Sequence, residues 1–273
     1  MLQNLHTHCT FCDGKDTPEQ MVQRAVELGF DSLGFSSHAM TDAHTQYELK
    51  DVEGYKTEIN RLKEKYAGKI EIFLGCELDY YSAGIMPTDG FEYTIGSVHV
   101  TKLPDGRSVT YDECYEWAKE YVEDYFGGDS LAYARLYFDT VADLPNRLGN
   151  FDIVGHFDLL TKYSEEHPEL IDLDSKKYKS IALEALHALR EKKEIFEVNT
   201  GAIGRGYRTT PYPAPFILDE MKRLDCKIVL TSDCHNRDFL DCNFKESYEY
   251  IRAHGFEEIY YLTSNHGFLG HKI

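Results

Sequence analysis

Short apolar segments alternate with amphipathic segments along almost the whole chain. The apolar segments have the length of strands, and the segments between them place apolar residues at helical spacing among charged ones. Strands are predicted near residues 1–5, 30–35, 69–74, 92–99, 151–154, 195–198, 227–230 and 258–262. Helices are predicted near residues 17–28, 51–66, 174–192, 216–224 and 238–254, with Thr17 and Asp174 as N-caps and Gly29 as a stop.

Residues 111–148 interrupt this alternation with a long aromatic stretch that is mostly helical in pattern. A break is predicted at Gly127-Gly128-Asp129, because paired glycines end helices readily. The tyrosines of this stretch are expected to pack the insertion. It is the one segment whose pattern suggests a subdomain or a lid.

Strand and helix alternate about seven times, which is typical of parallel βα units. A closed parallel barrel is the favoured architecture, and an open doubly wound sheet is the alternative. The first strand is not followed by G-x-G-x-x-G, which counts against a dinucleotide-binding fold. The chain has no internal repeat, low-complexity tract or linker, so residues 1–273 are predicted to form one domain.

The charge of the chain restricts its partners. Its 29 basic and 47 acidic residues give a net charge of −18, which disfavours binding to nucleic acid or to anionic membranes. A phosphorylated small molecule remains compatible with this charge, because bound divalent cations reverse the sign of the potential within a site. The sequence leaves the oligomeric state open.

The cysteines and the apolar segments indicate the cellular compartment in which the protein is expected. Seven scattered cysteines, an odd number, do not resemble a disulfide framework and favour a reducing cytoplasm. Neither a signal peptide nor a membrane-length apolar segment is visible. The chain is therefore expected to be cytoplasmic.

Residues of metal-ligand type fall at the ends of the predicted strands. In a βα barrel the carboxyl ends of all strands meet on one face, where active sites lie. His6 and His8 also share one side of an extended strand. The candidates at strand ends are His6, His8, His38, Glu77, His99, His156, Asp233 and His235.

These candidates are too many for one ion, since a tetrahedral zinc uses four ligands. Two or three divalent metals that share a bridging carboxylate fit the number better. Imidazole and carboxylate ligands suit zinc, iron or manganese. His44 and His266 are candidates for outer contacts, whereas Cys9-x-x-Cys12 is disfavoured as a redox or zinc motif because no second such pair exists.

At this point the sequence resembles the polymerase and histidinol phosphatase (PHP) superfamily, and within it the stand-alone histidinol-phosphate phosphatase branch. The resemblance spans nearly the whole chain. It rests on His6-x-His8, Asp13-Gly14, His38, Gly75-Cys76-Glu77, Gly96-Ser97-Val98-His99, Gly155-His156-Phe157-Asp158, Glu197-Val198-Asn199-Thr200 and Ser232-Asp233-Cys234-His235.

The resemblance implies a distorted (β/α)7 barrel with three divalent metals and a helical insertion around 111–148. It implies three ligand sets: His6, His8, Glu77 and Asp233 for the first metal; Glu77, His99 and His156 for the second, with Glu77 bridging; and Asp13, His38 and His235 for the third. Asp13 also has the simpler interpretation of a turn residue before glycine.

The implied reaction is hydrolysis of L-histidinol phosphate to L-histidinol and phosphate in histidine biosynthesis, through a hydroxide held by the metals. Glu77, Asp233 and His235 are the expected catalytic residues, the last two as proton donors to the leaving oxygen. The alternatives are a phosphoesterase of this fold that acts on a nucleotide or a sugar phosphate, and a non-catalytic metal-binding module.

Cationic side chains are also expected at the phosphate. Arg205, Lys162 and Arg208 follow predicted strands, and arginine's planar fork matches phosphate oxygens. Asp42 or Asp158 is a candidate for binding the substrate's amine and imidazole.

Overall fold

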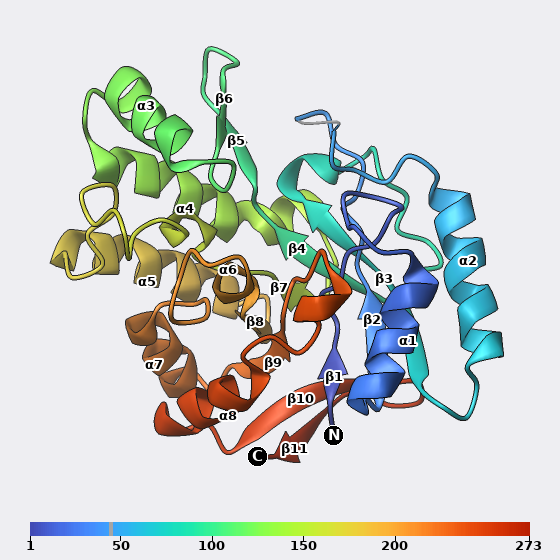
Figure 1. The fold of residues 1–273 in the computed structure, drawn as a ribbon. Helices are drawn as coiled ribbons and strands as arrows, with labels where there is room; N and C mark the ends of the chain where they lie inside the picture. Colours follow the sequence, from blue (N-terminus) through green and yellow to red (C-terminus); the bar gives the residue numbers. More distant parts are fainter. Residues whose placement is uncertain (44–45) are drawn as a thin grey trace.

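Parallel strands form the centre of the molecule and curve into a nearly closed barrel (Figure 1). The structure is a computed structural model that describes residues 1–43 and 46–273. Within these residues the main sheet has seven strands, in the order β1 (Gln3–Asn4), β2 (Ser32–Phe35), β3 (Glu71–Asp79), β4 (Tyr93–Ser97), β7 (Ile153–Val154), β8 (Ile195–Asn199) and β9 (Lys227–Thr231).

All neighbouring strands of this sheet pair in parallel. Beyond β1 and β9, a parallel bridge joins Thr7 to Cys234, and the His8 amide donates to the Cys234 carbonyl at 2.9 Å. The two edges of the sheet therefore meet. The predicted barrel is confirmed, and the alternative of an open doubly wound sheet is not what the chain forms.

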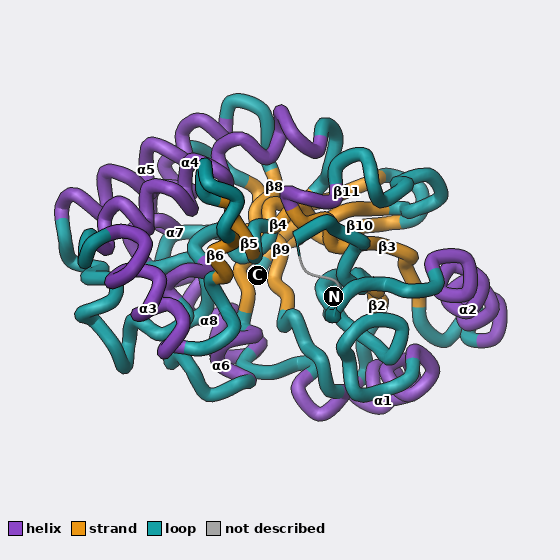
Figure 2. The backbone as a smooth tube through the Cα atoms, turned by 90° about the horizontal axis from the view of Figure 1, so that it is seen from above, coloured by secondary structure: helices purple, strands orange, loops and turns teal. Residues whose placement is uncertain are grey.

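Helices surround the barrel, as the view from above in Figure 2 shows. They are α1 (Pro18–Leu28), α2 (Val52–Lys65), α4 (Ser130–Leu148), α5 (Lys176–Arg190), α7 (Pro215–Arg223) and α8 (Phe244–Ala253). Thr17 caps α1 in a capping box with Gln20, and Gly29 ends it at a φ of 77°, both as predicted. The predicted cap of α5 is wrong by one position: Ser175 accepts the bond from the Tyr178 amide.

The inward faces of the strands change from apolar to polar along the barrel. Near the amino ends they form a buried cluster of Leu5, Phe73, Tyr93, Ile95, Ile153 and Val229, together with Leu262. Because side chains alternate along a strand, Glu77 shares a face with Phe73, and Asp233 continues the face of Val229. One end of the barrel is thus a packed core, and the carboxyl ends of the strands carry the polar groups.

The predicted last strand does not join the barrel sheet. β10 (Glu258–Thr263) pairs antiparallel with β11 (Gly267–Lys272) and contributes Leu262 to the apolar cluster of the barrel. β11 was not predicted, because its sequence is largely exposed and contains two glycines. This hairpin therefore covers the amino end of the barrel.

The insertion is helical and is interrupted near Gly127, as predicted, but a strand hairpin precedes its first helix. α3 (Tyr115–Phe126) and α4 are separated at Gly127, which has a φ of 60°. A hairpin of β5 (Val100–Lys102) and β6 (Ser108–Thr110) precedes them. Three-residue strands are too short for a readable alternation, which explains why they were missed. The insertion's Tyr137 donates to the His156 carbonyl at 3.4 Å and so joins it to the barrel.

In the described part of the chain, no helix is both long and apolar enough to cross a membrane.

Candidate metal centre and active site

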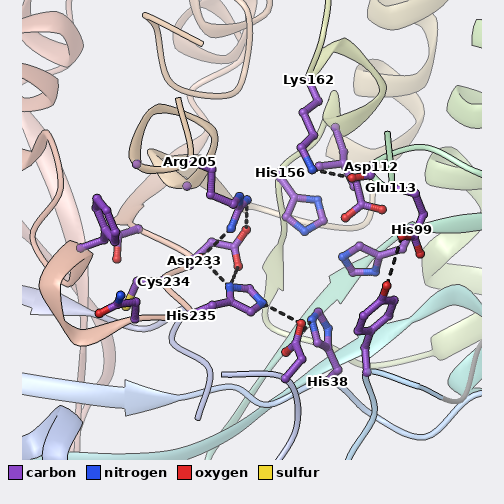
Figure 3. A pocket seen from close by; sticks show the side chains of 18 of the residues that line it. His38, His99, Asp112, Glu113, His156, Lys162, Arg205, Asp233, Cys234 and His235 are labelled. Atoms are coloured by element: carbon purple, nitrogen blue, oxygen red, sulfur yellow. Dashed lines mark hydrogen bonds and ion pairs between the residues drawn. The ribbon is translucent and has the colours of Figure 1, made fainter. Parts of the chain in front are cut away.

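A pocket of about 340 Å³ opens at the carboxyl ends of the strands. Six of the nine predicted ligands line it: Asp13, His38, His99, His156, Asp233 and His235 (Figure 3). The other three, His6, His8 and Glu77, are buried beside it and at most 1% exposed. The fold therefore brings all nine residues to one place.

Glu77 stands at the centre of this arrangement, and its two oxygens face different histidines. Oε1 lies 3.3 Å from His99 Nε2 and 3.0 Å from His156 Nε2. Oε2 lies 3.3 Å from His6 Nε2 and 3.5 Å from His8 Nε2. Ligands of one tetrahedral ion with bonds near 2.1 Å are about 3.4 Å apart, so these spacings suit two ions that share Glu77.

Asp233 completes the first group. Its Oδ1 lies 3.5 Å from His6 Nε2 and 3.2 Å from His8 Nε2. Within the described residues, His6 Nε2, His8 Nε2 and Glu77 Oε2 are buried without a hydrogen-bond partner. Buried polar atoms are rarely left unpaired, and three that converge fit a bound cation. The first predicted ligand set therefore fits a metal.

The third group is more open to solvent. His235 Nε2 lies 3.2 Å from Asp13 Oδ2, and His38 Nε2 lies 3.6 Å from Asp13 Oδ1. The side chains of Asp13 and His235 are 24% and 23% exposed. Asp13 thus lies among residues of metal-ligand type. His38 also reaches Glu77 Oε2 through Nδ1 at 2.8 Å, which links this group to the centre.

Two buried carboxylates to which the sequence analysis assigned no role contact the histidines from outside the ligand groups. Glu197 accepts from His6 Nδ1 at 2.6 Å, from the His156 amide at 2.6 Å and from Thr231 Oγ1 at 2.6 Å. Asp79 lies 3.3 Å from His99 Nδ1 and accepts from the His99 amide at 3.0 Å. A glutamate between Phe196 and Val198 in an otherwise buried strand was the signal that would have revealed Glu197.

The charges of the centre shift the pKa values of its histidines in both directions. Burial, reinforced by His235 and His38, lowers the pKa of His8 to about 3, which keeps this imidazole neutral. Burial also opposes charge on His6 and His99, but Glu197 at His6 and Glu77 at His99 outweigh it and raise both pKa values well above the usual value. Protons and metal cations thus compete for the same ring nitrogens.

The three predicted phosphate ligands lie in different surroundings. Arg205 lines the pocket and donates to the Asp233 carbonyl at 3.0 Å and to Asp233 Oδ2 at 3.2 Å. Lys162 also lines the pocket, with its ammonium on the Asp112 carbonyl. Arg208 is buried outside the lining, where it bonds Thr161 and lies 3.7 Å from Glu165.

The remaining candidates lie away from the pocket or outside the described residues. Asp158 is fully buried and accepts from the Ala214 amide at 2.9 Å, and Asp42 is an exposed partner of Lys102 at 2.9 Å. His266 is exposed in the β10–β11 turn, and His44 lies outside the described residues. Within those residues no cysteine belongs to a ligand group.

Comparison with known families gives one match over most of the chain. The family model described as "PHP domain" matches residues 4–201. That range contains seven of the nine ligand residues, from His6 to His156, whereas Asp233 and His235 follow it.

Relatives of similar length extend the match. A probable histidinol-phosphatase of Schizosaccharomyces pombe is 27% identical over 90% of this chain and 84% of its own. The histidinol-phosphatase of Bacillus subtilis is 27% identical over 84% of this chain and 92% of its own. The structure of histidinol phosphate phosphatase from Lactococcus lactis, solved with zinc, L-histidinol and phosphate, is 22% identical, covers 95% of both chains and has a TM-score of 0.72. At that identity it supports the fold.

Proposed function

Because this chain belongs to the PHP domain family, we propose that its metal centre hydrolyses L-histidinol phosphate to L-histidinol and inorganic phosphate, a step of histidine biosynthesis. The observation that carries the proposal is the position of Glu77, whose two oxygens face different histidines beside a pocket that Arg205 also lines. Relatives named histidinol-phosphatases that span most of this chain supply the substrate.

Three ligand groups would hold the metals. They are His6, His8, Glu77 and Asp233; Glu77, His99 and His156; and Asp13, His38 and His235. Nitrogen and oxygen donors suit zinc, iron and manganese. Divalent cations in such a centre lower the pKa of water and neutralise the phosphoryl oxygens.

The chain's own residues would bind and orient the substrate. Arg205 is held by two contacts to Asp233, and among the described residues its other N–H donors have no hydrogen-bond partner, so they would bind phosphate oxygens from the pocket wall. Lys162 adds a positive charge on the same lining. We assign catalytic roles to Glu77, which joins the two inner groups, and to Asp233 and His235, which line the pocket and would pass a proton to the leaving oxygen. Arg208 has a structural role in this proposal.

We also assign the reaction to the cytoplasm. Each of the seven cysteines, all within the described residues, is a free thiol, which suits a reducing compartment. The net charge of −18 supports a small-molecule substrate and disfavours nucleic acid.

A substrate panel tests the proposal. The metal-loaded protein should hydrolyse L-histidinol phosphate with a kcat/KM at least about 100-fold above that for adenosine monophosphate or glucose 6-phosphate, since a site with matched polar contacts discriminates strongly. Similar turnover of all three would favour a general phosphoesterase. Full metal content without hydrolysis would favour a binding module.

A further inference from the structure

Two charged side chains near the pocket have no place in the proposed chemistry. Arg208 was predicted to bind phosphate and Asp158 to bind the substrate's amine, yet their exposed fractions are 4% and 0%. Burying a guanidinium or a carboxylate costs free energy unless hydrogen bonds replace those lost to water. The contacts of these two residues therefore indicate what they do in the fold.

Both residues lie on loops that carry the proposed phosphate ligands. The β7 loop, residues 155–175 between β7 and α5, contains Lys162. The β8 loop, residues 200–214 between β8 and α7, contains Arg205. Figure 3 shows Lys162 and Arg205 entering the pocket from these two segments. The separation of the two cations therefore depends on how the loops are held together.

Hydrogen bonds join the two loops at several points, with every donor on the β8 loop and every acceptor on the β7 loop. The pairs, donor first, are Arg208 with Thr161, Thr209 and Thr210 with Glu165, and Ala214 with Asp158. Glu165 accepts from the Thr209 amide at 2.7 Å. Asp158 Oδ2 accepts from the Ala214 amide at 2.9 Å, where α7 begins. The two loops are thus held together as one unit.

Arg208 is the link that lies nearest in sequence to both phosphate ligands. It follows Arg205 by three residues, and its acceptor Thr161 directly precedes Lys162. A second guanidinium nitrogen of Arg208 donates to the Thr210 hydroxyl at 3.3 Å. Because the guanidinium is a rigid planar fork, it binds two acceptors in a fixed geometry, which a flexible ammonium does not.

The β8 loop is also closed at its base. Asn199 and Tyr212 exchange two backbone hydrogen bonds of 2.9 Å, and the Arg208 guanidinium lies 4.6 Å from the centre of the Tyr212 ring. The side chain of Arg205 is 32% exposed, whereas that of Arg208 is 1% exposed. The loop therefore presents one arginine to the pocket and is anchored by the other behind it.

We propose that Arg208 is a positioning residue, which holds Arg205 at the distance from Lys162 that a phosphate group requires. This inference rests on the proposed function, in which those two cations bind the phosphate. Arg208 itself touches no substrate and acts through Arg205. A side chain that is already fixed in its binding geometry loses less conformational entropy when the ligand arrives, so the anchor raises the affinity for phosphate.

Calorimetric titration of metal-loaded protein with inorganic phosphate tests the inference without turnover. Arg208→Met should weaken phosphate binding by about 10-fold, the lower end of the value of a charged hydrogen bond. Thr161→Val removes one acceptor of Arg208 and should cause a smaller loss, since the bond to Thr210 remains. Arg223→Met removes an exposed arginine of α7 and is the control, which should bind phosphate as the wild type does.

A double variant separates positioning from general damage to the fold. In an Arg205→Ala background, Arg208→Met should weaken phosphate binding by less than about 2-fold, because its effect passes through Arg205. Metal content and thermal melting of each variant report on folding, and if Arg208→Met does not fold, the same comparison with Thr161→Val decides. Equal losses in both backgrounds, or no loss beyond that of Arg223→Met, would overturn the inference.

The failure of the proposed function has a different signature. A wild-type protein that shows these phosphate affinities but does not prefer L-histidinol phosphate among phosphate esters overturns the proposed substrate and supports this inference. A wild-type protein whose phosphate affinity is unchanged by Arg205→Ala overturns the phosphate subsite and, with it, the role of Arg208.

Discussion

Among single residues, Glu197 shows how the barrel interior supports the ligands. It is fully buried and takes four hydrogen bonds, including one from Asn199 Nδ2 at 2.9 Å. A carboxylate on the Nδ1–H of His6 fixes the tautomer that leaves Nε2 as the metal-binding atom. Glu197 is therefore a positioning residue for the first metal.

Glu197→Gln should weaken the first metal's affinity by about 10- to 100-fold, the usual effect of losing such an outer partner. The measurement is metal content per chain after dialysis against graded chelator. Glu194→Gln, at an exposed site just before the same strand, is the control and should keep wild-type metal content. Unchanged metal retention in Glu197→Gln would refute the role.

The histidine pKa values predict that metal uptake releases protons. Burial lowers the pKa of His6, His38 and His99, but nearby carboxylates outweigh it, and each pKa ends above the usual 6.5. These rings hold protons near neutral pH, so a metal must displace them, and apparent affinity should rise as the pH increases from about 6 to 8. Calorimetry in buffers of different ionisation enthalpy counts the released protons. Affinity that is flat over this range would contradict the prediction.

Eight of the nine proposed ligands were predicted because each lies near the end of a predicted strand, where its side chain reaches the common face, and the family resemblance added Asp13. Glu197 and Asp79 were assigned no role, because only the folded barrel shows which histidines their carboxylates contact. Arg208 was predicted at the phosphate, but the course of its loop turns it toward Thr161. The spacing of residues in the sequence does not predict the direction in which a loop side chain points.

Among the elements, β3 and β4 show why the apolar end of the barrel tolerates few substitutions. Tyr93 crosses the interior and donates to the Leu5 carbonyl at 2.5 Å and to the Phe35 carbonyl at 3.1 Å. A Cβ at Gly75 would lie 2.3 Å from its ring. Gly75 precedes Glu77 on the same inward face, so the packing of this ring helps to set the position of the bridging carboxylate.

Gly75→Ala should destabilise the fold by about 1–3 kcal/mol, the usual range for overpacking a core. Urea unfolding of the metal-loaded protein measures this. A Gly75→Ala/Tyr93→Leu double variant should lose less than the sum of the single losses, because the smaller side chain relieves the contact. If the loss of stability in the double variant equals the sum of the two single losses, Tyr93 is not what the added methyl group at Gly75 collides with.

The elements that the sequence predicted are those with long patterns. The seven barrel strands and the helices around them were found, whereas β5, β6 and β11 were not. The first two are three residues long, and β11 is mostly exposed, so none has a clear apolar period. β10 was predicted as a strand, but its pairing outside the barrel sheet was not, because its partner β11 was not predicted.

For the whole molecule, the centre needs both ends of the chain. Residues 202–273, beyond the family match, supply β9, Asp233 and His235, and the bridge from Thr7 to Cys234 sets them against His6 and His8. A chain with a net charge of −18 repels a phosphate ester at long range. In the proposed mechanism, metal ions, Arg205 and Lys162 would therefore supply the positive charge that attracts the phosphate into the pocket.

The most direct test is to titrate chelator-treated protein with manganese or zinc while measuring phosphate release from L-histidinol phosphate and metal content in the same samples. The account predicts no turnover without metal, recovery only as at least two ions bind each chain, and no recovery in a folded His8→Asn control. Full turnover by the metal-free protein, or recovery complete at one ion per chain, would contradict it.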